Sequence, residues 1–218
     1  MSRKPDPSLR IRILDEAEHL MHLRGYNHTS LDEIALRCKM TKSNLIHHFR
    51  SKEELGRAVM DFKIDCYKEA FEKTLSVCSG PERAVSELFR RAARFQRGNG
   101  CRAGCLVGNM ALEMSDINER FRERAGRFFL GWARALECRM RGLKERGCYP
   151  PSFDPRASAE AVLSLYEGSI MLARARRDPS IIARVAKEAR RLVSPQDRKK
   201  PKKMKAEVSM GPKTPCGC

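Results

Sequence analysis

The segment from Thr41 to His48 carries hydroxyl, ammonium, amide and imidazole groups within eight residues. If it is a helix that turns Leu45 and Phe49 toward a small core, the remaining side chains face outward. Such groups suit hydrogen bonds to phosphate oxygens and base edges, and an asparagine on adenine contributes about 1–3 kcal/mol of discrimination. The candidate DNA-binding residues in and beside this segment are Ser30, Thr41, Lys42, Ser43, Asn44, His47, His48 and Lys52.

Capping signals define the elements that must hold this segment. Ser30 and Ser51 are each followed three residues later by glutamate, a pattern typical of helix starts. The pattern predicts short helices over 30–38 and 41–48, between a helix that ends near Gly25 and a long helix from 51. Two short helices joined by a tight turn make a helix-turn-helix, whose second helix enters the major groove of DNA. From periodicity alone, a plain helical bundle with exposed polar residues fits equally well.

Helical periodicity also dominates the rest of the chain. Further helices are expected over 81–98, 105–114 and 117–146, and after the Asp-Pro pairs at 154 and 178, giving an all-α fold of about nine helices. Residues 196–218 are rich in lysine, proline and glycine, and we expect a disordered basic tail there. We favour non-specific DNA attraction over nuclear localisation as the role of its lysines.

Composition excludes several classes of protein. The 218 residues carry a net charge of +17, which favours polyanionic partners, although most of the excess lies outside residues 1–62. No apolar run is long enough to cross a bilayer and no leader is evident, so we expect a cytoplasmic protein. The nine cysteines lack metal-site spacing, and no phosphate loop or nucleophile elbow occurs, so we expect no metal, no cofactor and no enzymatic activity. His19 and His22 have ligand spacing without a third ligand, which favours a solvated face.

Two stretches resemble the TetR family of bacterial transcriptional regulators: TSLDEIA at 29–35 and MTKSNLIHHFRSKEEL at 40–55. The likeness covers about residues 7–67, and the phrase at 104–116 is similar to part of some members' regulatory domains. The resemblance implies an all-helical homodimer that binds a palindromic operator and is released by a small molecule. It implies a DNA-binding domain at 7–67 with its recognition motif at 30–49, and a ligand-binding and dimerisation domain at 68–195. Operator binding would place the protein at the bacterial nucleoid.

By position, Lys42, Ser43, Asn44, His48 and Lys52 match family DNA-contact positions. Three departures stand out: Cys38 replaces the usual alanine, Lys39 the usual glycine, and Ile46 the usual tyrosine that touches phosphate. If the turn at Lys39 needs a positive φ, lysine there costs about 1 kcal/mol.

Middle-helix side chains supply candidates for a mostly apolar effector pocket with a few orienting polar groups, although each of them also fits ordinary core. The candidates are Phe89, Asn109, Met110, Glu113, Met114, Phe128, Trp132, Tyr166 and Arg174. Apolar stripes on the last two helices favour a four-helix dimer interface or packing within one chain. The stripes are Ala161, Val162, Leu165, Tyr166, Ser169 and Ile170, and Ile181, Ile182, Val185, Ala186, Ala189 and Val193.

Cys105 is a further hypothesis. A helix start beside Arg102 would lower a thiol pKa and suit an electrophile or redox switch. The simpler interpretation is a small buried residue at a helix start. Two alternative functions remain at this point: a cysteine-based electrophile- or redox-sensing repressor, and a non-specific architectural DNA-binding protein.

Overall fold

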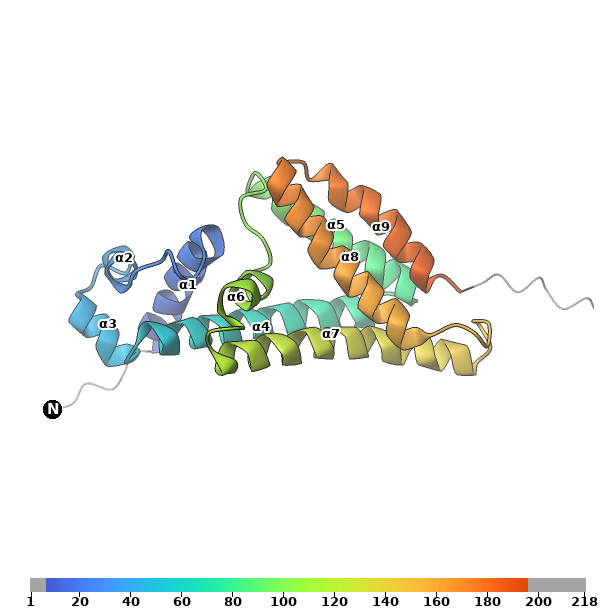
Figure 1. Cartoon of the computed structure of the whole chain (residues 1–218), viewed down its shortest axis with the longest axis horizontal. Coiled ribbons are helices and arrows are strands. Elements are labelled where there is room, and N and C mark those ends of the chain that lie inside the picture. The colour runs from blue at the N-terminus through green and yellow to red at the C-terminus, as the bar shows by residue number, and fades with distance from the viewer. Residues whose placement is uncertain (1–6, 196–218) are drawn as a thin grey trace, which may run out of the picture.

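The computed structural model describes residues 7–195, and in that range the chain is all-helical, with nine helices and no strand. Figure 1 shows the helices, whose bounds are α1 (Pro7–Arg24), α2 (Leu31–Arg37), α3 (Lys42–His48), α4 (Lys52–Val77), α5 (Pro81–Gly98), α6 (Leu106–Met114), α7 (Glu119–Glu145), α8 (Pro155–Arg176) and α9 (Ser180–Val193). The predicted fold class is confirmed. The expected basic tail at 196–218 lies outside the described residues.

Side-chain caps set the starts of the helices around the predicted helix-turn-helix. The hydroxyl oxygens of Ser30, Thr41 and Ser51 accept the backbone N–H three residues on, at 3.1, 3.2 and 3.0 Å. Each cap satisfies a donor that the helix itself leaves free. Asp154 caps α8 in the same way.

The turn between α2 and α3 is left-handed at Lys39, where φ is 54°. The backbone N–H of the next residue, Met40, bonds the carbonyl of Ala35 at 3.0 Å, which closes the end of α2. This geometry is the one that glycine adopts without strain, so the lysine costs about 1 kcal/mol. The departure noted in the sequence therefore falls on a strained residue.

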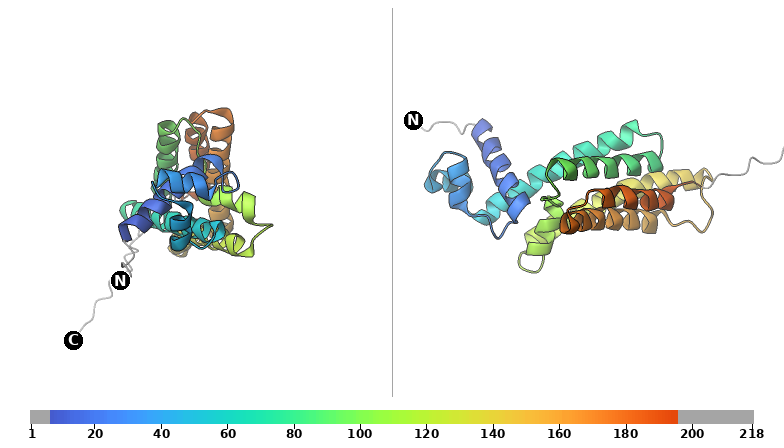
Figure 2. Two further views of the ribbon diagram at one scale, coloured as in Figure 1. Left: turned by 90° about the vertical axis from the view of Figure 1, so that its left-hand side faces the viewer. Right: turned by 90° about the horizontal axis from the view of Figure 1, so that it is seen from above.

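Two hydrophobic cores lie along the molecule. The first joins α1–α4 to α6 and the beginning of α7, and the second joins α5, α8 and α9 to the end of α7. Figure 2 shows α1–α3 gathered at one end and α5, α8 and α9 toward the other, with α4 reaching from one group to the other. Because the first core includes residues from both sides of position 67, the helix-turn-helix does not pack alone.

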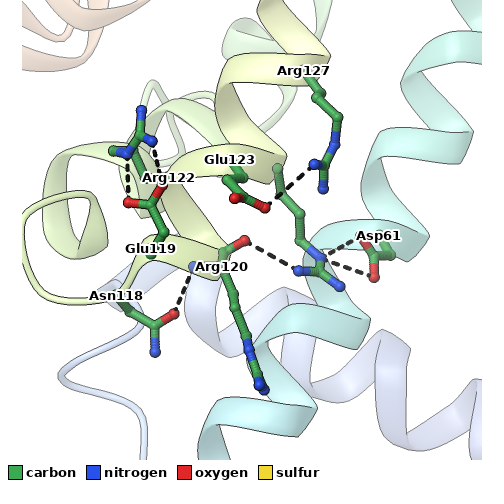
Figure 3. Close-up of polar contacts among 8 residues, drawn as sticks. Asp61, Asn118, Glu119, Arg120, Arg122, Glu123 and Arg127 are labelled. Carbon is green, nitrogen blue, oxygen red and sulfur yellow. Dashed lines mark hydrogen bonds and ion pairs between the residues drawn. The ribbon is translucent and has the colours of Figure 1, made fainter.

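Polar contacts fasten α7 to α4 near the helix-turn-helix (Figure 3). Asn118 caps α7 by accepting the N–H of Arg120 at 3.1 Å. One turn later, the Arg124 Nε donates to both carboxylate oxygens of Asp61 on α4, at 2.9 and 3.2 Å. This fork holds the N-terminal half of α4 against the regulatory half of the chain. Among residues 7–195, no helix is long and apolar enough to span a membrane.

Candidate nucleic-acid interface and ligand cavity

Helix α3 buries one face and leaves the other bare. Leu45 and Phe49 are fully buried, at 0 % exposure. The polar positions around them differ: Lys42, Ser43, Asn44 and His47 are exposed, and His48 is half-buried. Ile46 is also exposed, at 40 %. It stands at the position where the family usually has a tyrosine, so no hydroxyl is present there to bind phosphate. The segment therefore presents the polar surface that the sequence predicts.

Ser30 and Thr41 already use their oxygens as helix caps. A hydroxyl that accepts a backbone N–H still has its own O–H to donate, so both residues remain able to bind a phosphate oxygen. Both are exposed. The caps therefore leave the predicted phosphate contacts of Ser30 and Thr41 as a prediction that their hydroxyls can still make.

The two lysines predicted to contact DNA already have partners in the chain. Lys42 Nζ lies 2.8 Å from an Asp32 carboxylate oxygen, in an exposed ion pair. Lys52 Nζ donates to the Asn27 carbonyl at 3.1 Å and lies 4.7 Å from the centre of the Tyr26 ring. Burial lowers the pKa of Lys52, and the nearby Glu113 opposes that shift. Lys52 is thus half-buried and tied to the turn after α1, whereas Lys42 must leave Asp32 to reach a phosphate.

Arg10 is a cation at this surface that the sequence analysis did not single out. Its guanidinium lies 4.2 Å from the centre of the Phe49 ring and donates to the His48 carbonyl at 3.3 Å. It is exposed, so α1 adds a positive charge at the end of α3. The packing of α1 against α3 brings Arg10 to this surface, and no local sequence motif indicates that position.

A cavity of about 260 Å³ lies between α4, α5, α7 and α8. Three predicted pocket residues line it: Phe128, Trp132 and Tyr166. Trp132 stacks on Phe71 with ring centres 5.0 Å apart. A more open hollow of about 390 Å³ includes Asn109 and Arg174, and it shares Cys105 and Glu167 with the first. The cavity is aromatic on most sides.

The other predicted pocket residues line neither space. Phe89 is buried and packs edge-on against Tyr166, with ring centres 5.3 Å apart. Met110 and Met114 point into the first core. Glu113 accepts the backbone N–H groups of Tyr26 and Asn27, at 3.1 and 2.8 Å. Neither space reaches these four side chains, and apolar periodicity cannot distinguish a residue that lines a cavity from one that packs in a core.

Burial works against the lowered thiol pKa expected at Cys105. Cys105 caps α6 through its sulfur, but burial and the neighbouring Glu167 raise the pKa of its thiol well above the usual range. The N–H groups of Gly108 and Val107 oppose this only in part. A buried thiol beside a carboxyl stays protonated, so the helix start does not activate it. The seven cysteines within the described range are all free thiols.

His22 is buried at 4 % exposure, which corrects the expected solvated face, whereas His19 is exposed. Its Nε2 lies 2.6 Å from the Gly104 carbonyl and its Nδ1 lies 3.1 Å from Glu18. Lys63 Nζ is 2.7 Å from the same Glu18 oxygen. Burial raises the pKa of Glu18, but these two bonds outweigh it and leave the pKa at about 2. No cluster of three possible metal ligands occurs among residues 7–195.

The apolar stripes on α8 and α9 are mostly used within the chain. Val162, Ile170, Ile182, Ala189 and Val193 belong to the second core. The exposed apolar side chains of α8 are different ones, Met171 at 60 % and Leu172 at 46 %. The face of α8 left uncovered is therefore about a third of a turn away from the predicted stripe.

Comparisons with known proteins agree with this geometry. Residues 13–59 match the family model for bacterial regulatory proteins of the tetR family, and residues 81–188 match the C-terminal domain model of LmrA/YxaF-like transcriptional regulators. The chain is 31 % identical to the transcriptional regulator AcuR of Cereibacter sphaeroides over 173 residues, 78 % of each protein. It is 25 % identical to the repressor DhaR of a Mycobacterium species, over 78 % of this chain and 83 % of that one.

Solved structures show the same fold. A regulatory protein TetR from Rhodobacter sphaeroides superposes with a TM-score of 0.78 at 24 % identity, covering 85 % of this chain and 98 % of that one. The reduced form of Escherichia coli NemR gives a TM-score of 0.74 at 20 % identity, covering 86 % and 99 %.

Proposed function

The chain belongs to the TetR family of bacterial transcriptional regulators, and we propose that it acts as a homodimeric repressor which binds a palindromic operator through α3 and releases it when a small molecule enters the cavity. The observation that carries this proposal is the bare polar face of α3 over a fully buried Leu45 and Phe49. A rigid helix with that face is suited to the major groove.

We assign the base contacts to the exposed side of α3. Asn44 is the candidate for an adenine contact, with Ser43 and His47 beside it. Lys42, His48, Arg10, and the hydroxyls of Ser30 and Thr41 are candidates for phosphate contacts. Lys52 holds the turn after α1 and contacts phosphate only if it leaves the Asn27 carbonyl.

We propose that two copies meet through the outer face of α8, together with α9. Met171 and Leu172 are exposed there, and within residues 7–195 no neighbouring atom lies within 4 Å of where a Cβ on Gly168 would be. A second copy can approach closely over such a surface. A twofold dimer would set two α3 helices at half-sites about 34–36 Å apart.

Two contacts connect the cavity wall with α1, and a third, from outside the cavity, holds the turn after α1. Gly104 and Lys63 line the cavity and bind His22 and Glu18 of α1. Glu113 of α6 holds the backbone of the turn after α1. A ligand that favours one arrangement of Gly104 and Lys63 would therefore favour one position of α1, which is the differential interaction that release requires.

We propose a DNA-binding domain at 7–67 and a ligand-binding and dimerisation domain at 68–195, joined by α4. Binding to chromosomal operators would place the protein in the cytoplasm at the nucleoid. The relatives named above are transcriptional regulators, and we propose that this chain likewise has no catalytic activity.

The experiment is an operator-binding measurement by fluorescence anisotropy at fixed salt. We expect a palindrome from the promoter next to the gene to bind at least ~1000-fold more tightly than a scrambled duplex. Asn44→Ala should lose about 1–3 kcal/mol of that difference. Lys73→Ala, an exposed lysine near the end of α4, is the control and should bind as the wild type does. Equal affinity for both duplexes would contradict the proposal.

A further inference from the structure

The cavity wall contains two acceptors whose hydrogen-bonding capacity residues 7–195 do not fully satisfy. Gln96 is 1 % exposed and lines the cavity. Its Nε2 donates to the Ala103 carbonyl at 2.6 Å, so the amide cannot turn over without bringing two oxygens together. Its Oε1 is buried and has no hydrogen-bond partner among the described residues. An unpaired buried acceptor destabilises the protein, and a hydrogen-bond donor bound in the cavity would relieve that cost.

Glu167 is the second such acceptor. It lines both the cavity and the adjoining hollow, and its neighbour is the Cys105 thiol. Burial raises the pKa of Glu167 to about 7, and the thiol hydrogen bond opposes this only partly. No salt bridge to Glu167 occurs in residues 7–195, so its charge is uncompensated.

The two cations on the cavity wall are already engaged. Lys63 pairs with Glu18 at 2.7 Å and lies 5.4 Å from the centre of the Tyr67 ring. The Arg91 Nε donates to Glu87 at 2.8 Å, and its NH1 donates to the Ala70 carbonyl at 3.1 Å. Neither is available for a carboxylate or phosphate ligand without breaking these bonds. Arg174 lines only the adjoining hollow, so within the cavity itself the groups left to be paired are the acceptors Gln96 and Glu167, which suit a positively charged donor.

The rest of the wall suits the body of such a ligand. Trp132 and Tyr166 lie with ring centres 5.4 Å apart, and Phe71 and Phe128 extend the aromatic surface. Aromatic faces attract cations and bury apolar groups. At about 260 Å³ the cavity is at the small end for ligand sites, which favours a compact ligand with one ring.

We propose that the effector of this protein is a small apolar amine, whose ammonium group binds Glu167 and Gln96 and whose apolar part packs on the aromatic wall. This inference extends the proposed function and rests on it only in treating the amine as an effector that releases DNA. Amine binding itself is measured without DNA. The hydroxyls of Tyr67 and Tyr166, which have no hydrogen bond among residues 7–195, can accept further N–H hydrogen bonds from the ammonium group.

Trp132 is the single tryptophan of the chain, so its fluorescence reports directly on the cavity. The probes are 2-phenylethylamine, 2-phenylethanol and phenylacetate, which share one ring and differ in head-group charge. We expect the amine to quench Trp132 and to bind at least ~10-fold more tightly than the alcohol or the acid, because a hydrogen bond to a charged group exceeds a neutral one.

Glu167→Gln keeps the shape of the side chain and should abolish the preference for the amine, whereas Gln96→Met should weaken it. Glu188→Gln, an exposed carboxylate on α9, is the matched control and should keep the preference. A thermal melt of each variant verifies folding.

Tighter binding of phenylacetate, a preference that survives Glu167→Gln, or no quenching by any of the three probes would overturn the proposal. If the amine binds selectively but the operator stays bound, the ligand class stands and the proposed coupling to DNA fails instead.

Discussion

The Nε2 of His22 lies 2.6 Å from the carbonyl oxygen of Gly104, 82 residues further along the chain. The first residue belongs to the helix that supports the recognition helix, and the second to the cavity wall. The same imidazole stacks on Phe95, another wall residue, with ring centres 5.6 Å apart. Both ring nitrogens lie within hydrogen-bond distance of an oxygen, one from Glu18 and one from Gly104.

Replacing His22 should therefore weaken both the fold and the connection between the two halves. We expect His22→Ala to lower the free energy of unfolding by about 2 kcal/mol, because it removes two buried hydrogen bonds and a ring contact. His19→Ala, three residues earlier and exposed, is the control. Urea denaturation of both variants provides the measurement. Equal stabilities would show that the His22 contacts contribute nothing.

The pair of Lys42 and Asp32 predicts a gain of function. Because Asp32 holds Lys42 at 2.8 Å and is itself negative, Asp32→Asn should free the lysine and reduce repulsion from phosphate. We expect operator affinity to rise about 2- to 5-fold at low salt and the gain to shrink as salt increases. Asp65→Asn, an exposed carboxylate on α4, is the control. A loss of affinity in Asp32→Asn would mean that the pair orients Lys42 rather than restrains it.

The left-handed turn at Lys39 predicts a stabilising substitution. At φ 54° a Cβ is strained, so Lys39→Gly should raise the free energy of unfolding by up to about 1 kcal/mol. Lys39→Ala keeps the strain and should change stability little. Thermal melts of the two variants at equal concentration distinguish them. Identical melting temperatures would show that the positive φ at Lys39 costs no stability.

Glu167 predicts a pH dependence of stability. The folded-state pKa of about 7 lies above the ordinary 4.5, so the folded protein retains a proton that the unfolded chain loses. The contribution of this protonated carboxyl to the free energy of unfolding is complete below pH 4.5. It is lost as the pH rises through 7, which lowers the free energy of unfolding by up to about 3 kcal/mol. Glu167→Gln should flatten this part of the curve and be the more stable protein at pH 8. Parallel curves for the two proteins in urea titrations from pH 4.5 to 8 would contradict this.

The exposed α8 side chains predict the oligomeric state. Met171→Asp should place a charge in the proposed dimer interface and convert the dimer to monomers in sedimentation velocity. Operator affinity should then fall about 100-fold or more, since each half-site binds separately. Val77→Asp, at 71 % exposure at the end of α4, serves as the control and should stay dimeric. If both variants stay dimeric, the interface lies elsewhere.

Local signals were sufficient for the helices and for the polar face of α3. The caps at Ser30, Thr41 and Ser51 act within three residues, and the burial of Leu45 follows from one helical period. These are short-range effects, and sequence patterns report them well. The prediction of the all-α fold is confirmed for the same reason.

Contacts between residues far apart in the sequence could not be predicted from helical periodicity. Glu113 was expected in the pocket and instead binds the turn after α1, and His22 was expected in solvent and instead binds Gly104. The acceptors Gln96 and Glu167 look like ordinary surface residues of charged helices. Which side of a helix faces a cavity depends on how α5, α7 and α8 cross, and one-dimensional periodicity does not contain that information.

Helix α4 has 26 residues, and by helical geometry it is about 39 Å long. It begins one residue after the Ser51 cap and passes the aromatic wall at Tyr67 and Phe71, so it forms a stiff connection between that wall and α3. A tilt of about 5° over that length moves the far end by about 3 Å, as much as the whole span of a hydrogen bond. In a symmetric pair the two displacements add, and a half-site spacing that matched one turn of the duplex would no longer match.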